Sequence, residues 1–296
     1  MWRLSGQIWC GLRRADFGLL AFLPFIGTAA AEPALWVAKS DSATIYLFGT
    51  IHVLKPDTDW RGPKIKQAFD SSSTLWLELA EGTQSTLDQK TMWKYGKDPA
   101  HPLSTKLSKA EWQKLREAAS YTGIPTVAFE SMRPWLAALT LIQAPMFKAG
   151  YKGEMGVDNQ LFDDAKATKK TVMGLETVEQ QLRIFADLPP ELELELLNQA
   201  VDQVDEAAKR VDETARAWLA GEVDDLTNLL KRDEDENGTF MHKILLTDRN
   251  TNWADRLAGL AKGGGTHFVA VGAAHLAGSD SVQNLLKQRG FTVERL

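Results

Sequence analysis

Two stretches far apart in the chain, IYLFGTIHVL at residues 45–54 and FVAVGAAHLA at residues 268–277, follow the same pattern. In each, an apolar run typical of a strand ends in a glycine, and after two further residues comes a histidine, His52 or His275. Glycine lets the chain turn sharply where a strand ends, and α/β folds place their ligands at the carboxyl edge of the sheet. The repeat therefore predicts a duplicated strand–Gly–x–x–His unit whose two halves face one another across a shared site.

The rest of the chain alternates between strand-like and helix-like segments. Apolar runs predict strands at 34–37, 43–49, 74–79, 126–129, 171–173, 266–272 and 291–295. Helices are expected at 63–71, from the capping box at Ser108 to Gly123, from Pro134 to about Gly150, at 157–167 and at 279–289. Strands at both ends with helices between and around them are typical of an α/β or α+β layered domain with a mixed central sheet. Neither group of strands alone makes a stable sheet, so strands from the two ends of the chain should pair.

The stretch 177–262 is helical in pattern and predicts a helical subdomain inserted before the last strands. It opens with a second capping box, from Thr177 to Gln180. Apolar residues within it recur at heptad spacing, namely Leu197, Val201, Val204, Ala208, Val211, Ala215 and Trp218. Packing within the chain, in a helical hairpin, is the favoured interpretation, and a coiled coil in a homodimer is the alternative.

The first 31 residues have the features of an export signal. Three arginines give a positive start, FGLLAFLPFI at 17–26 is a short apolar run, and small residues at 28–31 offer a cleavage site. The apolar run is shorter than a membrane-spanning helix requires. We therefore expect 32–296 to be the mature domain, exported to the periplasm or secreted, without a stable membrane span. A retained membrane anchor is the alternative.

The composition excludes some partners and some kinds of metal site. With 34 Lys and Arg against 39 Asp and Glu, the net charge is −5, so no broad basic face and no nucleic-acid partner are expected. The single cysteine, Cys10, lies in the expected export signal. A metal in the mature domain would therefore be held by His, Asp or Glu, which selects borderline-to-hard divalent ions.

A third candidate ligand stands near the end of the strand expected at 74–79. Glu78 is a carboxylate in an otherwise apolar run, where burial without a partner is costly. It is either the partner of an arginine, a solvated edge residue, or a ligand beside His52 and His275. Two imidazoles and a carboxylate would leave an open position for water, which is the pattern of a catalytic metal site.

Five further polar residues are weaker candidates for the site. Glu81 could act as a general base, and Arg249 could hold a substrate carboxylate or stabilise an oxyanion. Asp158, Glu176 and Asn250 are candidates for orienting ligands or substrate. The alternatives are a loop-surface charge for Glu81, a helix-dipole interaction for Asp158 and a surface salt bridge for Arg249.

In this order the motifs resemble the TraB/GumN family, which includes the Tiki-type metalloproteases. The matching stretches are Phe48–His52 (FGTIH), Leu77–Leu79 (LEL), Gly156–Asp158 (GVD), Gly174–Glu176 (GLE), Arg249–Asn250 (RN) and Val271–Gly278 (VGAAHLAG). They span nearly the whole of the expected mature chain.

The resemblance implies a two-part α/β fold, a divalent-metal site and peptide-bond hydrolysis. His52, Glu78 and His275 would be the ligands, with manganese or cobalt-like ions favoured and zinc possible as the metal. Some members carry an acid two residues after the glutamate, where this chain has Ala80, with Glu81 one position further on. Related folds include an erythromycin esterase and a haem-binding lipoprotein, so the fold alone does not decide the activity.

The function expected from the sequence is that of an exported metal-dependent hydrolase acting on a peptide or protein substrate. A non-enzymatic haem- or metal-binding protein of the cell envelope is the alternative. A third interpretation is a helical interaction module that uses the heptad-spaced residues 197–218.

Overall fold

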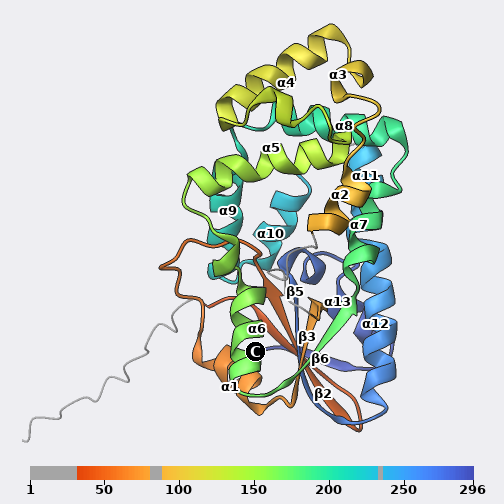
Figure 1. Cartoon of the computed structure of the whole chain (residues 1–296). Helices are drawn as coiled ribbons and strands as arrows, with labels where there is room; N and C mark the ends of the chain where they lie inside the picture. The colour runs from red at the N-terminus through yellow and green to blue at the C-terminus, as the bar shows by residue number, and fades with distance from the viewer. Residues whose placement is uncertain (1–31, 81–88, 233–235) are drawn as a thin grey trace, which may run out of the picture. The chain divides into compact units, whose positions relative to one another are not determined.

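The computed structural model describes residues 32–80, 89–232 and 236–296 (Figure 1). Within them one six-stranded sheet has the order β4-β3-β5-β2-β1-β6. The strands are β1 (Leu35–Lys39), β2 (Ala43–Thr50), β3 (Thr74–Leu79), β4 (Thr171–Glu176), β5 (Gly265–Gly272) and β6 (Thr292–Arg295). The first helices are α1 (Pro63–Ser71), α2 (Gln89–Gly96), α3 (Leu103–Lys106), α4 (Lys109–Thr122), α5 (Pro134–Lys148) and α6 (Val157–Ala167). The others are α7 (Val178–Ala186), α8 (Pro190–Asp202), α9 (Ala207–Leu219), α10 (Val223–Leu230), α11 (Glu236–His242), α12 (Asp248–Ala261) and α13 (Val282–Gln288). The predicted mixed α/β fold is confirmed.

Strands from the two ends of the chain pair, as the sequence requires. β2 and β5 run parallel, with Gly49 opposite Val271 and Thr50 opposite Gly272. β3 and β4 continue the parallel part of the sheet, while β1 pairs antiparallel with β2 and with β6. Because β2 and β5 are parallel neighbours, both Gly-x-x-His motifs leave the sheet at the same edge.

The two faces of the sheet carry separate cores, because successive side chains of a strand point to opposite faces. One core joins the strands to α1, α6 and α9, with Phe48, Phe268, Ile65, Leu161 and Trp218 among its members. The other joins them to α12 and α13, with Leu47, Val269, Trp253, Leu257 and Leu286 among its members. Figure 1 shows α1 and α6 on one side of the sheet and α12 and α13 on the other.

A third core contains no strand. It lies between α4, α5 and α8, with Leu115, Leu141 and Leu197 among its fully buried residues. The heptad-spaced residues 197–218 do not form one helix, because the chain turns at 203–206 between α8 and α9. Leu197 and Val204 pack in the helical core, whereas Trp218 packs against the sheet. The spacing therefore serves two cores of the same chain, and a homodimer stays a prediction.

One expected strand is wrong. Residues 126–129 form a single 3₁₀ turn, Thr126–Ala128, in place of a strand. The amide of Ala128 donates to Pro125 and the amide of Phe129 donates to Thr126. Val127 and Phe129 would share one face of a strand, but Phe129 is buried and Val127 is 76% exposed. The segment is also not part of the six-stranded sheet.

Two further expectations concern export and membrane insertion. The predicted export signal, residues 1–31, lies outside the described residues and stays a prediction. In the part of the chain that the structure describes, no helix has the length and apolar character to cross a membrane.

Trp218 ties α9 to the strand that carries the first motif, and it offers a test of this packing. Its buried Nε1 donates to the carbonyl oxygen of Gly49 at 2.7 Å. Trp218→Phe leaves that carbonyl without its partner, so we expect the free energy of unfolding in urea to fall by about 1–3 kcal/mol. Trp93→Phe, on α2 where the ring is 47% exposed, is the control and should change it little. Equal effects of the two substitutions would contradict this role of Trp218.

Candidate functional site

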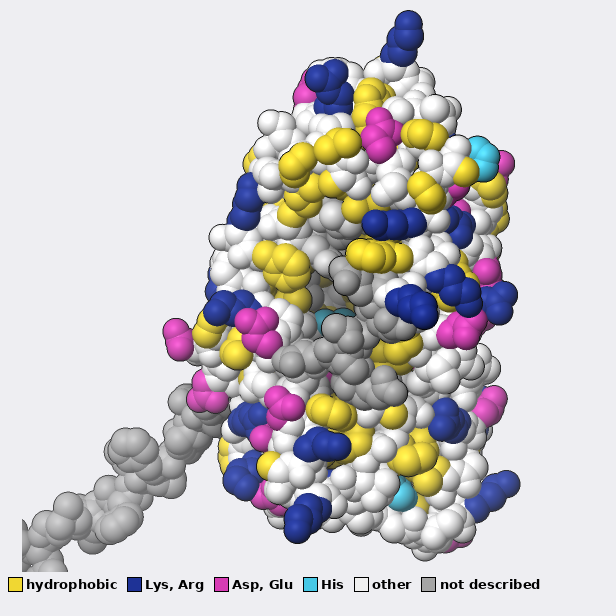
Figure 2. All heavy atoms as spheres, in the orientation of Figure 1, with side chains coloured by type: hydrophobic (Ala, Val, Ile, Leu, Met, Phe, Trp, Pro, Cys, Tyr) yellow, Lys and Arg dark blue, Asp and Glu magenta, His cyan; other side chains and the backbone are white. Residues whose placement is uncertain are grey.

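His52 and His275 leave the sheet from neighbouring strands. His52 lies two residues beyond the end of β2, and His275 lies in the 3₁₀ turn Ala273–Leu276 that follows β5. About half of the His52 side chain is exposed, whereas His275 is buried. Figure 2 shows histidine atoms at the bottom of a recess in the face turned to the viewer. The site therefore combines one imidazole that solvent reaches with one enclosed by protein.

Glycines at two positions allow the backbones of the loops around the site to come into direct contact. A Cβ atom on Gly49 would lie 3.0 Å from the Cα atom of Ala273, in the loop of the second motif. A Cβ atom on Gly156 would lie 2.3 Å from the carbonyl oxygen of His52. Side chains at either position would push the motif loops apart.

Glu78 completes the group that the sequence predicted. Its Oε1 accepts a hydrogen bond from the backbone N–H of Gly272 at 2.8 Å. A Cβ atom on Gly272 would lie 3.2 Å from Glu78 Oε1, 3.4 Å from His52 Nε2 and 3.6 Å from His275 Cδ2. The three predicted ligands thus surround a small space that the absence of a side chain at Gly272 keeps open.

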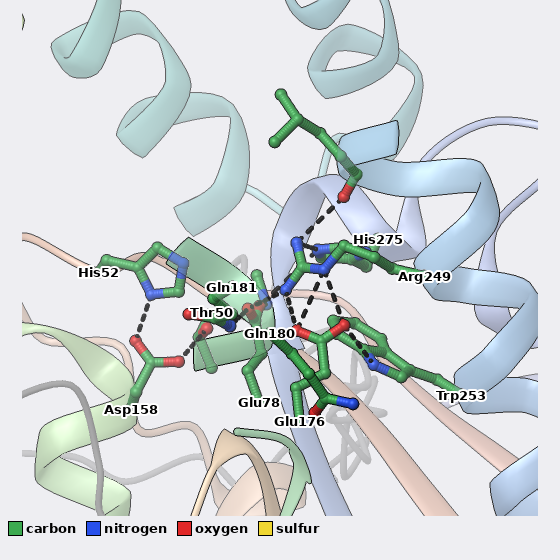
Figure 3. A network of polar contacts seen from close by, with 12 residues as sticks. Thr50, His52, Glu78, Asp158, Glu176, Gln180, Gln181, Arg249, Trp253 and His275 are labelled. Atoms are coloured by element: carbon green, nitrogen blue, oxygen red, sulfur yellow. Dashed lines mark hydrogen bonds and ion pairs between the residues drawn. The ribbon is translucent and has the colours of Figure 1, made fainter. Parts of the chain in front are cut away.

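Asp158 orients the first histidine (Figure 3). Its Oδ2 lies 2.8 Å from His52 Nδ1, and its Oδ1 accepts a hydrogen bond from the Thr50 hydroxyl at 2.5 Å. The Asp158 carboxylate, at the start of α6, raises the pKa of His52 to about 9, although burial acts in the opposite direction. With Nδ1 directed at Asp158, the Nε2 atom is the one that faces Gly272.

Asn250 orients the second histidine. Its Nδ2 donates to the carbonyl oxygen of Asp280 at 3.0 Å, so its Oδ1 faces His275 Nδ1, at 2.6 Å. Nδ1 must then carry the proton, which leaves a lone pair on Nε2. Burial, and then the positive charge of Arg249, lower the pKa of His275 to about 3. This imidazole is therefore neutral, as a metal ligand must be.

Arg249 lies among the acidic residues of the site. Its Nη2 donates to Glu78 Oε2 at 2.7 Å and to Glu176 Oε2 at 2.9 Å, and its Nη1 lies 3.0 Å from His275 Nε2. Its side chain is only 13% exposed, so the surface salt bridge weighed as an alternative is wrong. Burial alone would raise the pKa of Glu78, but His275, His52 and Arg249 hold it at about 2. Glu78 is therefore ionised.

Four contacts of the site were not predicted. Gln181 donates to Glu78 Oε2 at 2.9 Å, and the Trp253 ring lies 4.3 Å from the His275 ring. The Thr50 hydroxyl donates a hydrogen bond to Asp158, and the carbonyl oxygen of Asp280 accepts one from Asn250. Two of these residues had a signal in the sequence: Thr50 lies inside the first Gly-x-x-His motif, and Gln181 directly follows the capping box that opens α7. The predicted Glu81 lies outside the described residues.

As the side chains stand, they do not form a ready coordination shell. Among the described residues, no group of three or more His, Cys, Asp or Glu side chains is placed to hold a metal ion. The Arg249 guanidinium instead contacts both Glu78 and His275. What the geometry provides is a set of oriented nitrogen and oxygen donors, one fixed cation and an opening to solvent.

The contact between His52 and Asp158 can be tested by titration. On the metal-free protein, imidazole proton shifts followed by NMR should give His52 a pKa of about 9. Asp158→Asn removes the negative charge, so the pKa of His52 should fall to or below its ordinary value of 6.5. His52→Ala identifies the resonance. A parent pKa that Asp158→Asn leaves unchanged would contradict this contact.

Comparisons with known proteins agree with the motifs. The model of the TraB/PrgY/gumN family matches residues 34–295. The chain is 25% identical over 256 residues to the uncharacterized protein YbaP of Escherichia coli (strain K12), which covers 86% of this chain and 92% of that protein. It is 24% identical over 276 residues to an uncharacterized protein of Treponema pallidum (strain Nichols), covering 87% and 81%. No solved structure matches the chain significantly. Because the family model spans nearly the whole described domain, this chain belongs to the TraB/PrgY/gumN family.

Proposed function

We propose that this protein is an exported, divalent-metal-dependent hydrolase that cleaves peptide bonds, with His52, Glu78 and His275 as the metal ligands. The observation that carries the proposal is how the two imidazoles are held. Each has its Nδ1 directed at an oxygen acceptor, Asp158 Oδ2 or Asn250 Oδ1. Histidines that bind metals are held in this way by a carboxylate or carbonyl group, which fixes the ring and leaves the other nitrogen for the ion.

The donor set and the space at Gly272 fit a divalent ion. Two imidazole nitrogens and one carboxylate oxygen suit manganese, cobalt-like ions or zinc. The space at Gly272 is bordered by Glu78 Oε1 and His52 Nε2, with the His275 ring beside it. Glu78 is ionised and His275 is neutral, which are the protonation states that coordination needs. Two features must change when an ion binds. Arg249 Nη1 lies against His275 Nε2, and His52, whose pKa is about 9, must release the proton of its Nε2.

Beside the ion, the residues of the chain would have separate roles in the reaction. A bound ion would polarise a carbonyl group and lower the pKa of a bound water. Asp158 holds the proton of His52 Nδ1, and Asn250 holds that of His275. Arg249 has its guanidinium beside the ligands, where it can donate to a negative charge that develops on the substrate. The half-exposed His52 lies on the side that a substrate would enter.

The peptide-bond and export parts of the proposal have separate support. Peptide cleavage is supported by the resemblance of the motifs to the Tiki-type metalloproteases. Export is supported by the arginines, the apolar run and the small residues of segment 1–31. Bound metal without turnover would favour the alternative of a metal- or haem-binding protein.

Metal content is the first test. After loading with manganese, cobalt or zinc, the purified protein should hold about one ion per chain, as a site with three protein ligands does. The His52→Ala, His275→Ala double variant should hold none, measured by elemental analysis after removal of free metal. The loaded parent should then cleave members of a peptide library, and chelation should stop it. A parent that holds no metal under any of these conditions would overturn the proposal.

Gly272→Ala tests the space between the ligands without removing any of them. The backbone of Gly272 is in a region open to alanine, with φ −47° and ψ 136°, but the new methyl group would stand among the three donors. We expect metal affinity to fall on the order of tenfold or more, while thermal unfolding shows that the fold is kept. Gly259→Ala on α12, where nothing lies within 4 Å of the added carbon, is the matched control. Equal affinities in the two variants would place the ion elsewhere.

A further inference from the structure

The Arg249 guanidinium contacts two of the three side chains to which the proposed function gives the metal. Its Nη1 lies 3.0 Å from His275 Nε2, and its Nη2 donates to Glu78 Oε2 at 2.7 Å. An arginine keeps its positive charge at all relevant pH values. The site therefore contains a permanent cation at the lone pairs that a metal ion would need.

The same guanidinium is anchored on its other side. Its Nε donates to Glu176 Oε1 at 3.0 Å, its Nη2 to Glu176 Oε2 at 2.9 Å, and its Nη1 to the carbonyl oxygen of Leu245 at 3.0 Å. Leu245 lies in the π-helical turn Lys243–Thr247 that precedes α12. Trp253 completes the anchor, since its Nε1 donates to Glu176 Oε1 at 3.0 Å and its ring lies 4.6 Å from the guanidinium carbon.

A guanidinium has five N–H donors. In this site Nε donates to Glu176, Nη1 donates to Leu245 and His275, and Nη2 donates to Glu176 and Glu78 (Figure 3). The contacts to Glu176 and Leu245 involve none of the proposed ligands. The contacts to Glu78 and His275 can therefore be given up while the arginine stays anchored.

We infer that Arg249 is a built-in competitor for the metal ion, which lowers the affinity of the site by holding Glu78 and His275 itself. The inference rests on the proposed function, because it concerns the same three ligands. An incoming ion must replace two hydrogen bonds and tolerate a neighbouring positive charge.

Glu176 has the opposite effect on the metal. Because it shares the guanidinium with Glu78, it draws Arg249 away from the ligand. Without the negative charge of Glu176, Glu78 would be the one carboxylate of this pair that still attracts Arg249. The arginine would then hold Glu78 more firmly, and the metal ion would compete less well for Glu78. The competitor and its anchor should therefore shift metal affinity in opposite directions.

The test is isothermal titration of the metal-stripped full-length protein with manganese chloride. Arg249→Met should raise the affinity on the order of tenfold to a hundredfold, the range expected from loss of a hydrogen bond between charged groups. Glu176→Gln should lower it, and the double variant should bind more tightly than the parent. Arg256→Met is the matched control, because Arg256 lies on the same helix and also contacts a tryptophan ring and a backbone carbonyl, Trp76 and Leu175, but no ligand. It should leave the affinity unchanged.

Folding is checked by thermal unfolding of each variant. Arg249→Met leaves two buried carboxylates without their cation and can fail to fold. The double variant Arg249→Met, Glu176→Gln removes a cation and an anion together. If Arg249→Met does not fold, the manganese affinity of the double variant decides whether the inference holds. If the parent binds manganese and the folded Arg249 variants bind it equally well or more weakly, the inference is wrong and the proposed metal site stands. If neither the parent nor any variant binds manganese, and titrations with cobalt and zinc chloride also show no binding, both the proposed site and the inference are overturned.

Discussion

The parallel pairing of β2 with β5 is the constraint on which the rest of the structure depends. It places two strands from opposite ends of the chain side by side, with Thr50 opposite Gly272. Both histidine loops then begin at one edge of the sheet, and the missing side chain of Gly49 lets them touch. β3 pairs with the other side of β5, so Glu78 reaches the same edge. This order of strands brings the three side chains around Gly272.

Buried charge is the second organising feature. Glu78, Glu176 and Arg249 lie at the edge of a close-packed core, where an unpaired charge would be costly. Each has a partner of opposite sign, and Trp253, Gln181 and the Gly272 amide use the remaining acceptor positions. Such a network keeps its geometry because removing any member leaves another charge unsatisfied. The site is therefore held in place before any substrate or ion arrives.

The sequence predicted the parts of the site that stand at strand ends. His52, Glu78, Glu176 and His275 follow or end apolar runs, and the parallel strands bring those ends together. Arg249 and Asn250 were predicted as site residues from their Arg-Asn motif, and both contact His275. Side chains chosen by packing between helices carry no such signal, which is why Asp280 and Trp253 were missed. Local pattern also failed at 126–129, where a strand needs a neighbour that the fold does not supply, and at 203–206, where a helix pattern crosses a turn.

The pairing of β1 with β6 and of β2 with β5 has a consequence for how the molecule forms. Each pair joins residues that lie more than about two hundred positions apart, and contacts of such long sequence separation form slowly. The core between α4, α5 and α8 needs no strand and can form while the last residues are still being synthesised. The sheet edge with its two histidines cannot, because β5 begins at Gly265. A growing chain therefore has no assembled site until its synthesis is almost finished.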